Sequence, residues 1–249
     1  THQPNCNRDM EQITIYNDKT NKTKWYEYAI LLFIILWSGG GFTYGLFLEW
    51  MLYMMPVVGF IFFHRGYKLS NSTILLIGVV LSVHFLQMVN FGGAIVNLIK
   101  PTCLLLVCAM FAKIISCKFV KVYLDLVYFI SQVCLVLWVI CLFPLGLSFL
   151  RSIASQFPLL GWDNIESNTN IVDTLYIFSI PQDFKGLMRN SGPFWEPGRF
   201  TIYITLALAI NLFYFKEKIT SKNSLVLLLT NLTTFSTTGY VATATLYVG

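Results

Sequence analysis

A dense group of charged and backbone-fixing residues lies between Arg189 and Arg199. The segment reads Arg-Asn-Ser-Gly-Pro-Phe-Trp-Glu-Pro-Gly-Arg, which places two guanidinium groups and one carboxylate among two prolines and two glycines. Arginine offers a planar fork of N–H donors that matches phosphate oxygens. Proline and glycine fix the backbone and so lower the entropy that is lost on holding a ligand. The segment predicts a site for a phosphate or diphosphate, with Glu196 beside it as a candidate base.

The end of this segment adds a second reason to expect an anion. Pro197 and Gly198 come just before an apolar run, so free backbone N–H groups and the positive end of a helix dipole would face the same place. The same residue types are also typical of a plain loop with an interfacial tryptophan, where Arg199 only reaches toward the membrane surface. Both interpretations stay open at this point.

A hydroxyl-rich segment, Thr230–Tyr240, lies inside a later apolar run. Small hydroxyl residues allow helices to pack closely and to form hydrogen bonds across a bundle. The alternative is that they line a polar cavity in the outer half of a membrane span. On one continuous helix the residues at helical spacing would share a face, and these are Thr233, Ser236, Thr237 and Tyr240.

The composition says which elements must position these segments. Of the 249 residues, 56% are hydrophobic and 12% are charged, whereas soluble domains are about 25% charged. We therefore predict an all-α, polytopic integral membrane protein that forms a single domain over residues 1–249. About seven transmembrane helices are expected from the apolar runs, at 26–43, 44–63, 71–90, 94–116, 121–148, 199–215 and 223–247.

The basic residues predict the topology. Lys and Arg occur in the N-terminal tail (1–24) and in every second link between the predicted spans, while the short links between them carry none. By the positive-inside rule the N-terminus is cytoplasmic, and the net charge of +5 reflects topology and not nucleic-acid binding. The link over 149–198 then lies outside the cytoplasm, and a loop of that length is usually functional.

Isolated polar residues and prolines inside the predicted spans give weaker signals. Glu49 is a weak candidate site, because an acid within a membrane is costly. Asp125 is expected to form an interfacial ion pair with Lys121, and His84 to be a hydrogen-bonded core residue. The prolines predict a break or kink at Lys100-Pro101 and bends at Pro56 and Pro144. No P-loop, GxGxxG, HExxH or GxSxG occurs, so no motif supports an ATPase, a dehydrogenase or a zinc protease.

Two of these features together resemble a known family. The pattern is Arg189-x-x-Gly192-x-Phe194-x-Glu196-Pro197-Gly198, an apolar span, a short basic link, and then Leu232-Thr-Thr-Phe-Ser-Thr-Thr-Gly-Tyr240. It is similar to the O-antigen ligase/polymerase superfamily, above all to its exopolysaccharide and O-antigen polymerases. The resemblance covers about residues 185–245 and implies a GT-C-like inverting glycosyltransferase in the bacterial cytoplasmic (inner) membrane.

The resemblance also implies substrates and roles. Such enzymes pass an oligosaccharide from a polyprenyl (undecaprenyl) diphosphate to a second lipid-linked unit, without a nucleotide sugar, cofactor or metal. Arg189 and Glu196 would be catalytic: the arginine holds the diphosphate, and the carboxylate orients an arginine or, less favoured, deprotonates the acceptor hydroxyl. The residues expected to bind substrate are Gly192, Trp195, Pro197, Gly198, Arg199, Ser236 and Thr237. A chain-length regulator or a flippase is a candidate partner.

Two departures from the family pattern leave alternatives open. The ligases use a histidine in an external loop as a candidate base, but the predicted topology puts no histidine outside, so the base is an acid or lies beyond Gly249. We expect the chain to continue past that residue, because the family has further spans. An O-antigen ligase is the nearest alternative function. A transporter or flippase and a structural membrane subunit are the alternatives from other classes.

Overall fold

The computed structural model describes most of the chain, namely residues 23–37, 47–92, 96–156, 174–180, 183–184 and 187–248. Nearly all of the predicted cytoplasmic tail, the connection over 38–46 and the middle of the predicted external loop, over 157–173, lie outside these residues. Almost all of the regular structure in the described part is helical, which confirms the all-α class.

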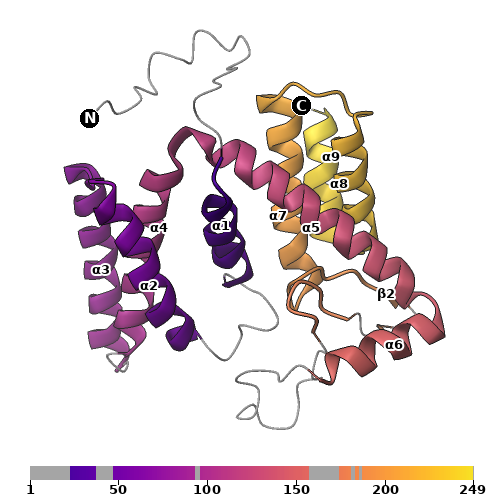
Figure 1. The fold of residues 1–249 in the computed structure, drawn as a ribbon, viewed down its shortest axis with the longest axis horizontal. Helices are drawn as coiled ribbons and strands as arrows, with labels where there is room; N and C mark the ends of the chain where they lie inside the picture. Colours follow the sequence, from indigo (N-terminus) through magenta and orange to yellow (C-terminus); the bar gives the residue numbers. More distant parts are fainter. Residues whose placement is uncertain are drawn as a thin grey trace.

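Nine α-helices form the described part of the chain (Figure 1). They are α1 (Trp25–Trp37), α2 (Phe47–His64), α3 (Asn71–Phe91), α4 (Val96–Ile115), α5 (Phe119–Cys141), α6 (Pro144–Ala154), α7 (Pro197–Ala209), α8 (Lys222–Thr233) and α9 (Thr237–Val248). A 3-10 turn, η2 (Ser116–Lys118), joins α4 to α5, and a π-helical segment, η3 (Ile210–Tyr214), extends α7. The strands β1 (Asp183–Phe184) and β2 (Leu187–Met188) pair as a small antiparallel hairpin.

The helices pack in two groups that α5 connects (Figure 1). In the first group, α2 and α3 both pack on α4, and α1 packs on α4 and α5. In the second group, α5 packs across α7 and α8, while α9 packs on α7 and α8. The segment before α7, which carries the arginine-rich motif, lies beside the C-terminal half of α5, because Trp138 Nε1 donates a hydrogen bond to Met188 O at 2.9 Å.

Four helices follow the predicted spans within a few residues. These helices are α2, α3, α4 and α7, and the corresponding predictions are 44–63, 71–90, 94–116 and 199–215. The predicted break at Lys100-Pro101 does not occur, since α4 continues through both residues. α1 corresponds to the first part of the span predicted over 26–43.

The fifth predicted span, 121–148, is wrong as a single helix. α5 ends at Cys141, and Pro144 begins the separate helix α6 instead of bending a longer one. Proline pushes the residue before it away from helical geometry, and Phe143 accordingly has φ −96° and ψ 129°. Proline is well tolerated at the first position of a helix, where no intrahelical N–H bond is needed. The predicted loop over 149–198 therefore begins with the second half of α6.

The seventh predicted span, 223–247, is also wrong as a single helix. Asn231 Nδ2 donates a hydrogen bond to Thr243 Oγ1 at 2.6 Å, whereas on a continuous helix the two residues would be about 18 Å apart along the axis. The chain instead reverses between Thr233 and Thr237, so α8 and α9 lie side by side as a helical hairpin (Figure 1). The predicted shared face of Thr233, Ser236, Thr237 and Tyr240 therefore does not exist, because two of these residues follow the turn and one lies in it.

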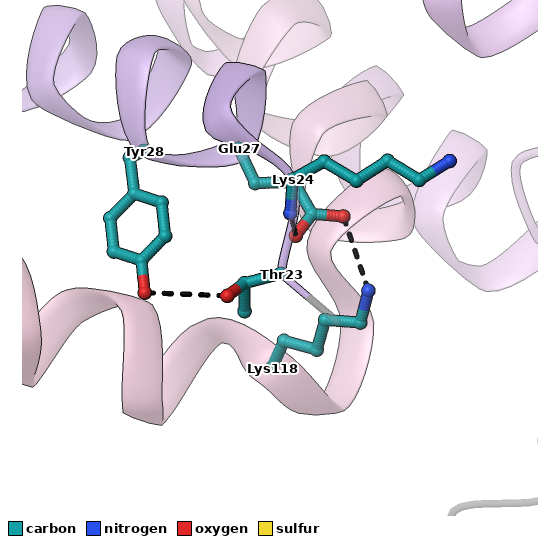
Figure 2. Close-up of polar contacts among 5 residues, drawn as sticks. All are labelled: Thr23, Lys24, Glu27, Tyr28 and Lys118. Atoms are coloured by element: carbon teal, nitrogen blue, oxygen red, sulfur yellow. Dashed lines mark hydrogen bonds and ion pairs between the residues drawn. The ribbon is translucent and has the colours of Figure 1, made fainter. Parts of the chain in front are cut away.

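A buried acid that the sequence did not single out joins α1 to the start of α5 (Figure 2). Glu27 is 1% exposed, and its Oε1 lies 3.3 Å from Nζ of Lys118. Its Oε2 accepts a hydrogen bond from the backbone N–H of Lys24 at 3.0 Å. A buried carboxylate requires such partners, because an unpaired charge away from water is very costly.

Two of the isolated polar residues predicted inside the spans, Asp125 and His84, have other contacts than expected. Asp125 Oδ2 accepts a hydrogen bond from Tyr28 Oη at 3.0 Å, and no ion pair joins Asp125 to Lys121, so that prediction is wrong. His84 is half-buried on α3, and no described residue forms a hydrogen bond with it, which contradicts the predicted core role. Glu49 lies in α2, but its side chain falls outside the described part of the structure.

Two helices in the described part are long and apolar enough to cross a membrane by length and composition. They are α3, over Asn71–Asn90, and α5. Shorter apolar helices occur at Trp25–Trp37, Tyr53–His64 and Thr102–Ile115. Only 6% of the α3 window is buried, so this helix presents most of its apolar surface to the surroundings.

Candidate functional site

The two polar segments that stand out in the sequence meet at the turn between α8 and α9. The backbone N–H of Asn190 donates to Thr233 O at 2.9 Å, and its Nδ2 donates to Thr233 Oγ1 at 3.0 Å. Next to it, Nε of Arg189 donates to Thr234 O at 3.3 Å. These partners are 43 to 45 positions apart in the sequence, so only the tertiary fold brings them together.

These contacts complete the C-terminal end of α8. The last carbonyl groups of a helix have no partner within the helix. Here the Leu232 carbonyl accepts a hydrogen bond from Tyr240 Oη at 2.7 Å, and the next two carbonyls are those that accept from Asn190 and Arg189. The arginine also places its positive charge at the negative end of the helix dipole. The loop before α7 and the end of α8 therefore stabilise each other.

The turn itself is formed by residues of the hydroxyl-rich segment. Phe235 has φ +47°, a left-handed conformation that reverses the chain after α8. Ser236 is buried, and its Oγ accepts a hydrogen bond from Gly239 N at 3.4 Å in the first turn of α9. Thr237 is exposed. The substrate-binding roles of Ser236 and Thr237 stay predictions. In the structure Ser236 caps the start of α9, and Thr237 is exposed.

A buried polar layer holds the hairpin against α7. Thr201 Oγ1 lies 3.1 Å from Asn231 Oδ1, to which it donates, and 3.0 Å from Thr234 Oγ1. Asn231 Nδ2 donates to Gly239 O at 3.3 Å as well as to Thr243 Oγ1. A Cβ atom at Gly239 would lie only 2.4 Å from Thr201 Cγ2, so glycine allows α9 to approach α7 this closely. These hydrogen bonds and this close approach fix the position of the α8–α9 turn relative to α7.

Gly192 shapes the loop that carries the arginine. Its φ is +57°, which side chains rarely adopt, and a Cβ there would lie 2.6 Å from the ring of Phe200. Its N–H donates to Asn190 Oδ1 at 3.0 Å, and its carbonyl accepts from Ser179 N at 2.6 Å. Asn190, which connects this loop to α8 through Thr233, is 0% exposed. The predicted involvement of Gly192 has a structural reason in this conformation.

Aromatic packing anchors the same loop to α7. The ring of Phe194, which is buried, stacks on the ring of Tyr203 with centroids 4.8 Å apart and an interplanar angle of 9°. Tyr203 O in turn accepts a hydrogen bond from Tyr123 Oη at 3.1 Å, which connects α7 to α5. Together with the hydrogen bond from Trp138 to Met188, this packing anchors the chain on both sides of Arg189.

Arg189 is held to the end of α8 through one side of its guanidinium group. Its side chain is half-buried, and Nε is committed to Thr234 O. No described residue accepts a hydrogen bond from its Nη atoms, which carry four of the five N–H donors of a guanidinium. A guanidinium that is fixed through Nε and open at both Nη atoms is suited to bind two oxygens of a phosphate.

The other predicted charges lie at the start of α7. The helix begins at Pro197, two residues before the predicted start at 199, and Glu196 is the N-cap residue, although its side chain forms no capping hydrogen bond. Glu196 is exposed, and no ion pair joins it to Arg189 or Arg199. The orienting role preferred for this carboxylate is therefore not seen. Arg199 Cζ lies 5.1 Å from the ring centroid of Trp195, a cation–π contact.

Two residues of this site were given no role by the sequence-based prediction. Asn190 and Thr201 are buried polar residues whose hydrogen bonds cross between segments. A single signal pointed to them: a polar side chain inside or beside an apolar run needs a partner in a helix bundle. The sequence could not say which partner.

Among the described residues no group of three or more His, Cys, Asp or Glu side chains is placed to hold a metal ion. Comparison of this chain with protein-family models, with curated proteins and with solved structures finds no match.

Proposed function

We propose that this protein is a multi-pass membrane glycosyltransferase that polymerises polyprenyl-diphosphate-linked oligosaccharides, or transfers them to a lipid core, at the outer face of the bacterial cytoplasmic membrane. One observation carries the proposal. The Arg189 loop and the hydroxyl-rich turn, the two segments on which the family resemblance rests, form one hydrogen-bonded unit, and no residue in the described part of the chain bonds to the two Nη atoms of the arginine.

The surface of α3 supports placement in a membrane. Ile74, Leu75, Leu76 and Val79 are each more than half exposed, and the polar side chains of this helix are too few to cover its apolar face. In water such a helix would bury this surface, because burial of apolar area is the main driving force of folding. In a bilayer the same surface is satisfied by lipid.

The distribution of basic links supports the proposed orientation. The N-terminal end of α1, the link between α4 and α5 and the link between α7 and α8 lie at one end of the molecule, whereas the loop before α7, which carries Arg189, lies toward the other (Figure 1). Two basic residues contact the first turn of α1: Lys118 pairs with Glu27, and Arg65 lies over the ring of Tyr26. By the positive-inside rule this end is cytoplasmic, and the arginine site then faces outward.

The proposed reaction needs a charge stabiliser and a base. The acceptor hydroxyl oxygen attacks the donor anomeric carbon, the bond from that carbon to the diphosphate oxygen breaks, and the leaving diphosphate gains negative charge. Arg189 would stabilise this charge through its Nη atoms, because they are already fixed in position. Glu196 is exposed and unpaired with either arginine, so it is available to accept the hydroxyl proton.

Complementation with the full-length protein tests the proposal. Wild type and the variants Arg189→Ala, Arg189→Lys and Glu196→Gln are expressed at equal levels in a host that lacks its own polymerase, and the surface glycan is separated on a gel. We expect a ladder with wild type and single units with Arg189→Ala, since loss of one such stabilising group lowers rates by about 100-fold or more. Arg189→Lys should give a short ladder, because lysine cannot form the bidentate contact.

The exposed Arg151 on α6 provides the matched control. Arg151→Ala removes the same charge outside the site and should leave the ladder unchanged. Full-length ladders from both Arg189→Ala and Glu196→Gln would contradict the site assignment. Transfer of single units onto the lipid core without any ladder, lost in the same variants, would identify a ligase.

A transporter or flippase is the second candidate, favoured by the α8–α9 hairpin. Short helices that end inside a membrane, next to polar groups, are a common way for transporters to form a binding site. The same strains distinguish the two functions. A transporter defect leaves lipid-linked units on the cytoplasmic side, whereas a polymerase defect leaves completed single units on the cell surface.

A further inference from the structure

An apolar groove lies between α2 and α4, away from the arginine site. Its volume is about 880 Å³, which is in the upper part of the range of roughly 300–1,000 Å³ that is typical of small-molecule sites. Phe60 and Phe63 on α2 and Leu106 and Met110 on α4 are among its apolar lining residues. Gly59 also lines it, and nothing lies within 4 Å of where its Cβ would be. The missing side chain keeps this part of the groove open.

One charged side chain, that of Lys68, lines the groove in the described part of the chain. The end of α2 fixes its place. Tyr67 N donates to Phe62 O at 3.1 Å, Gly66 N donates to Phe63 O at 2.9 Å, and Gly66 has φ +67°. This is the Schellman arrangement, and the accompanying apolar contact is present as the rings of Tyr67 and Phe62, 6.0 Å apart. The turn therefore holds Lys68 at the mouth of the groove.

The charge at this mouth is not neutralised within the described structure. Lys68 is exposed and forms no ion pair there. Arg65, three residues earlier, is also exposed, and its Cζ lies 5.2 Å from the ring of Tyr26. The nearest acid of α1, Glu27, already has Lys118 as its partner. The mouth is thus a positive site next to an apolar cleft.

We propose that this groove binds one anionic phospholipid of the cytoplasmic leaflet, with an acyl chain between α2 and α4 and the headgroup phosphate against Lys68. The inference rests on the membrane placement of the proposed function, though not on glycosyl transfer. The shape suits a flexible hydrocarbon chain, and the positive mouth suits a phosphate. Tyr67, Lys68 and Leu69, in the link after α2, line one part of the groove. This link lies at the same end of the molecule as the other basic links, and the loop before α7 lies toward the other end (Figure 1). A lipid phosphate at Lys68 is therefore distinct from a donor whose diphosphate meets Arg189.

Native mass spectrometry of the purified full-length protein in detergent tests the site, with phosphatidylglycerol, phosphatidylcholine and undecaprenyl phosphate as the three probes. Wild type should retain one phosphatidylglycerol in preference to phosphatidylcholine. Lys68→Gln should weaken phosphatidylglycerol binding about fivefold, because one lysine near a lipid surface contributes about that much. Gly59→Leu should abolish retention of both lipids, since the new side chain fills the groove without meeting another atom at its Cβ.

Two matched controls make the result specific. Gly78→Leu adds the same side chain to α3, where the space at Cβ is also open and where Gly78 is not among the residues that line this groove. Lys121→Gln removes an exposed charge near the same end of the molecule. Both should bind phosphatidylglycerol as wild type does. Unchanged binding in Gly59→Leu, an equal loss in Lys121→Gln, or preferred retention of undecaprenyl phosphate would each overturn the proposal. None of these results depends on glycan polymerisation, so the two proposals can fail separately.

Discussion

The link between Asn190 and Thr233 offers a direct test of how the arginine loop is held. Asn190→Ala removes two hydrogen bonds: the one from its Nδ2 to Thr233 Oγ1 at 3.0 Å, and the one from the N–H of Gly192 to its Oδ1 at 3.0 Å. The backbone hydrogen bond from residue 190 to Thr233 O is unaffected. The change therefore removes side-chain contacts while the chain path can persist.

The expected cost follows from burial. Asn190 is 0% exposed. The lost bond to Thr233 is worth about 1 kcal/mol, and the N–H of Gly192, which is left buried without a partner, costs about 1–3 kcal/mol. Asn190→Ala should thus lower the free energy of unfolding by about 2–4 kcal/mol. Thr233→Val should cost less, about 1–2 kcal/mol, because it leaves only the amide of Asn190 unsatisfied on this side.

A double-mutant cycle separates the shared contact from the rest. Unfolding of the purified protein by sodium dodecyl sulfate in mixed micelles is followed by circular dichroism for wild type, both single variants and the double variant. We expect a coupling energy of about 0.5–1.5 kcal/mol, the usual range for hydrogen bonds between helices in membranes. Thr238→Val is the control, because Thr238 is exposed, and it should stay within about 0.5 kcal/mol of wild type. Zero coupling, or an Asn190→Ala variant as stable as wild type, would refute the reasoning.

Two further predictions use the same unfolding measurement. Gly239→Ala should destabilise the protein by about 1–3 kcal/mol, because its Cβ would lie 2.4 Å from Thr201 Cγ2 and 2.9 Å from both Thr201 Oγ1 and Asn231 Oδ1. Thr201→Ser removes the methyl group but keeps the hydroxyl, so it should restore part of the loss. No rescue would show that this methyl group is not the main source of the cost. Glu27→Gln should lower the free energy of unfolding by about 1–2 kcal/mol through loss of the ion pair with Lys118; this figure is kept small because Lys118 is partly exposed. Lys121→Gln should be neutral, because Lys121 forms no ion pair within the described residues. Equal effects of the two changes would show that the buried pair contributes nothing specific.

The apolar runs were sufficient to predict where most helices lie. α3 and α7 match their predicted spans closely, because an uninterrupted apolar run of that length has few alternatives to a helix. A proline in an apolar run did not by itself predict whether a helix starts, bends or continues there. Pro197 was expected just before a helix and instead begins it, Pro144 starts a helix where a bend was expected, and α4 passes through Pro101 without a break.

The predicted site stays a prediction, and the structure adds how its residues interact with one another and with α8. Arg189 and Gly192 lie in a loop with a defined conformation, as the density of prolines and glycines indicated. The carboxylate of Glu196 does not orient either arginine in this structure. Asn190, which has no predicted role, turned out to connect the two segments, because a buried amide can bond to groups on two different elements at once.

Composition and apolar runs are enough to predict a helical protein with too little charge to face water on all sides, basic residues in every second link, and two polar segments that stand out from the apolar runs. Local sequence does not predict that the last apolar run reverses at Phe235 or that the carbonyl groups at the end of α8 accept hydrogen bonds from Arg189 and Asn190. The physical reason is that a long helix and a hairpin of two short helices have the same local composition. The choice between them depends on partners for the helix end, and these lie more than 40 residues away in the chain.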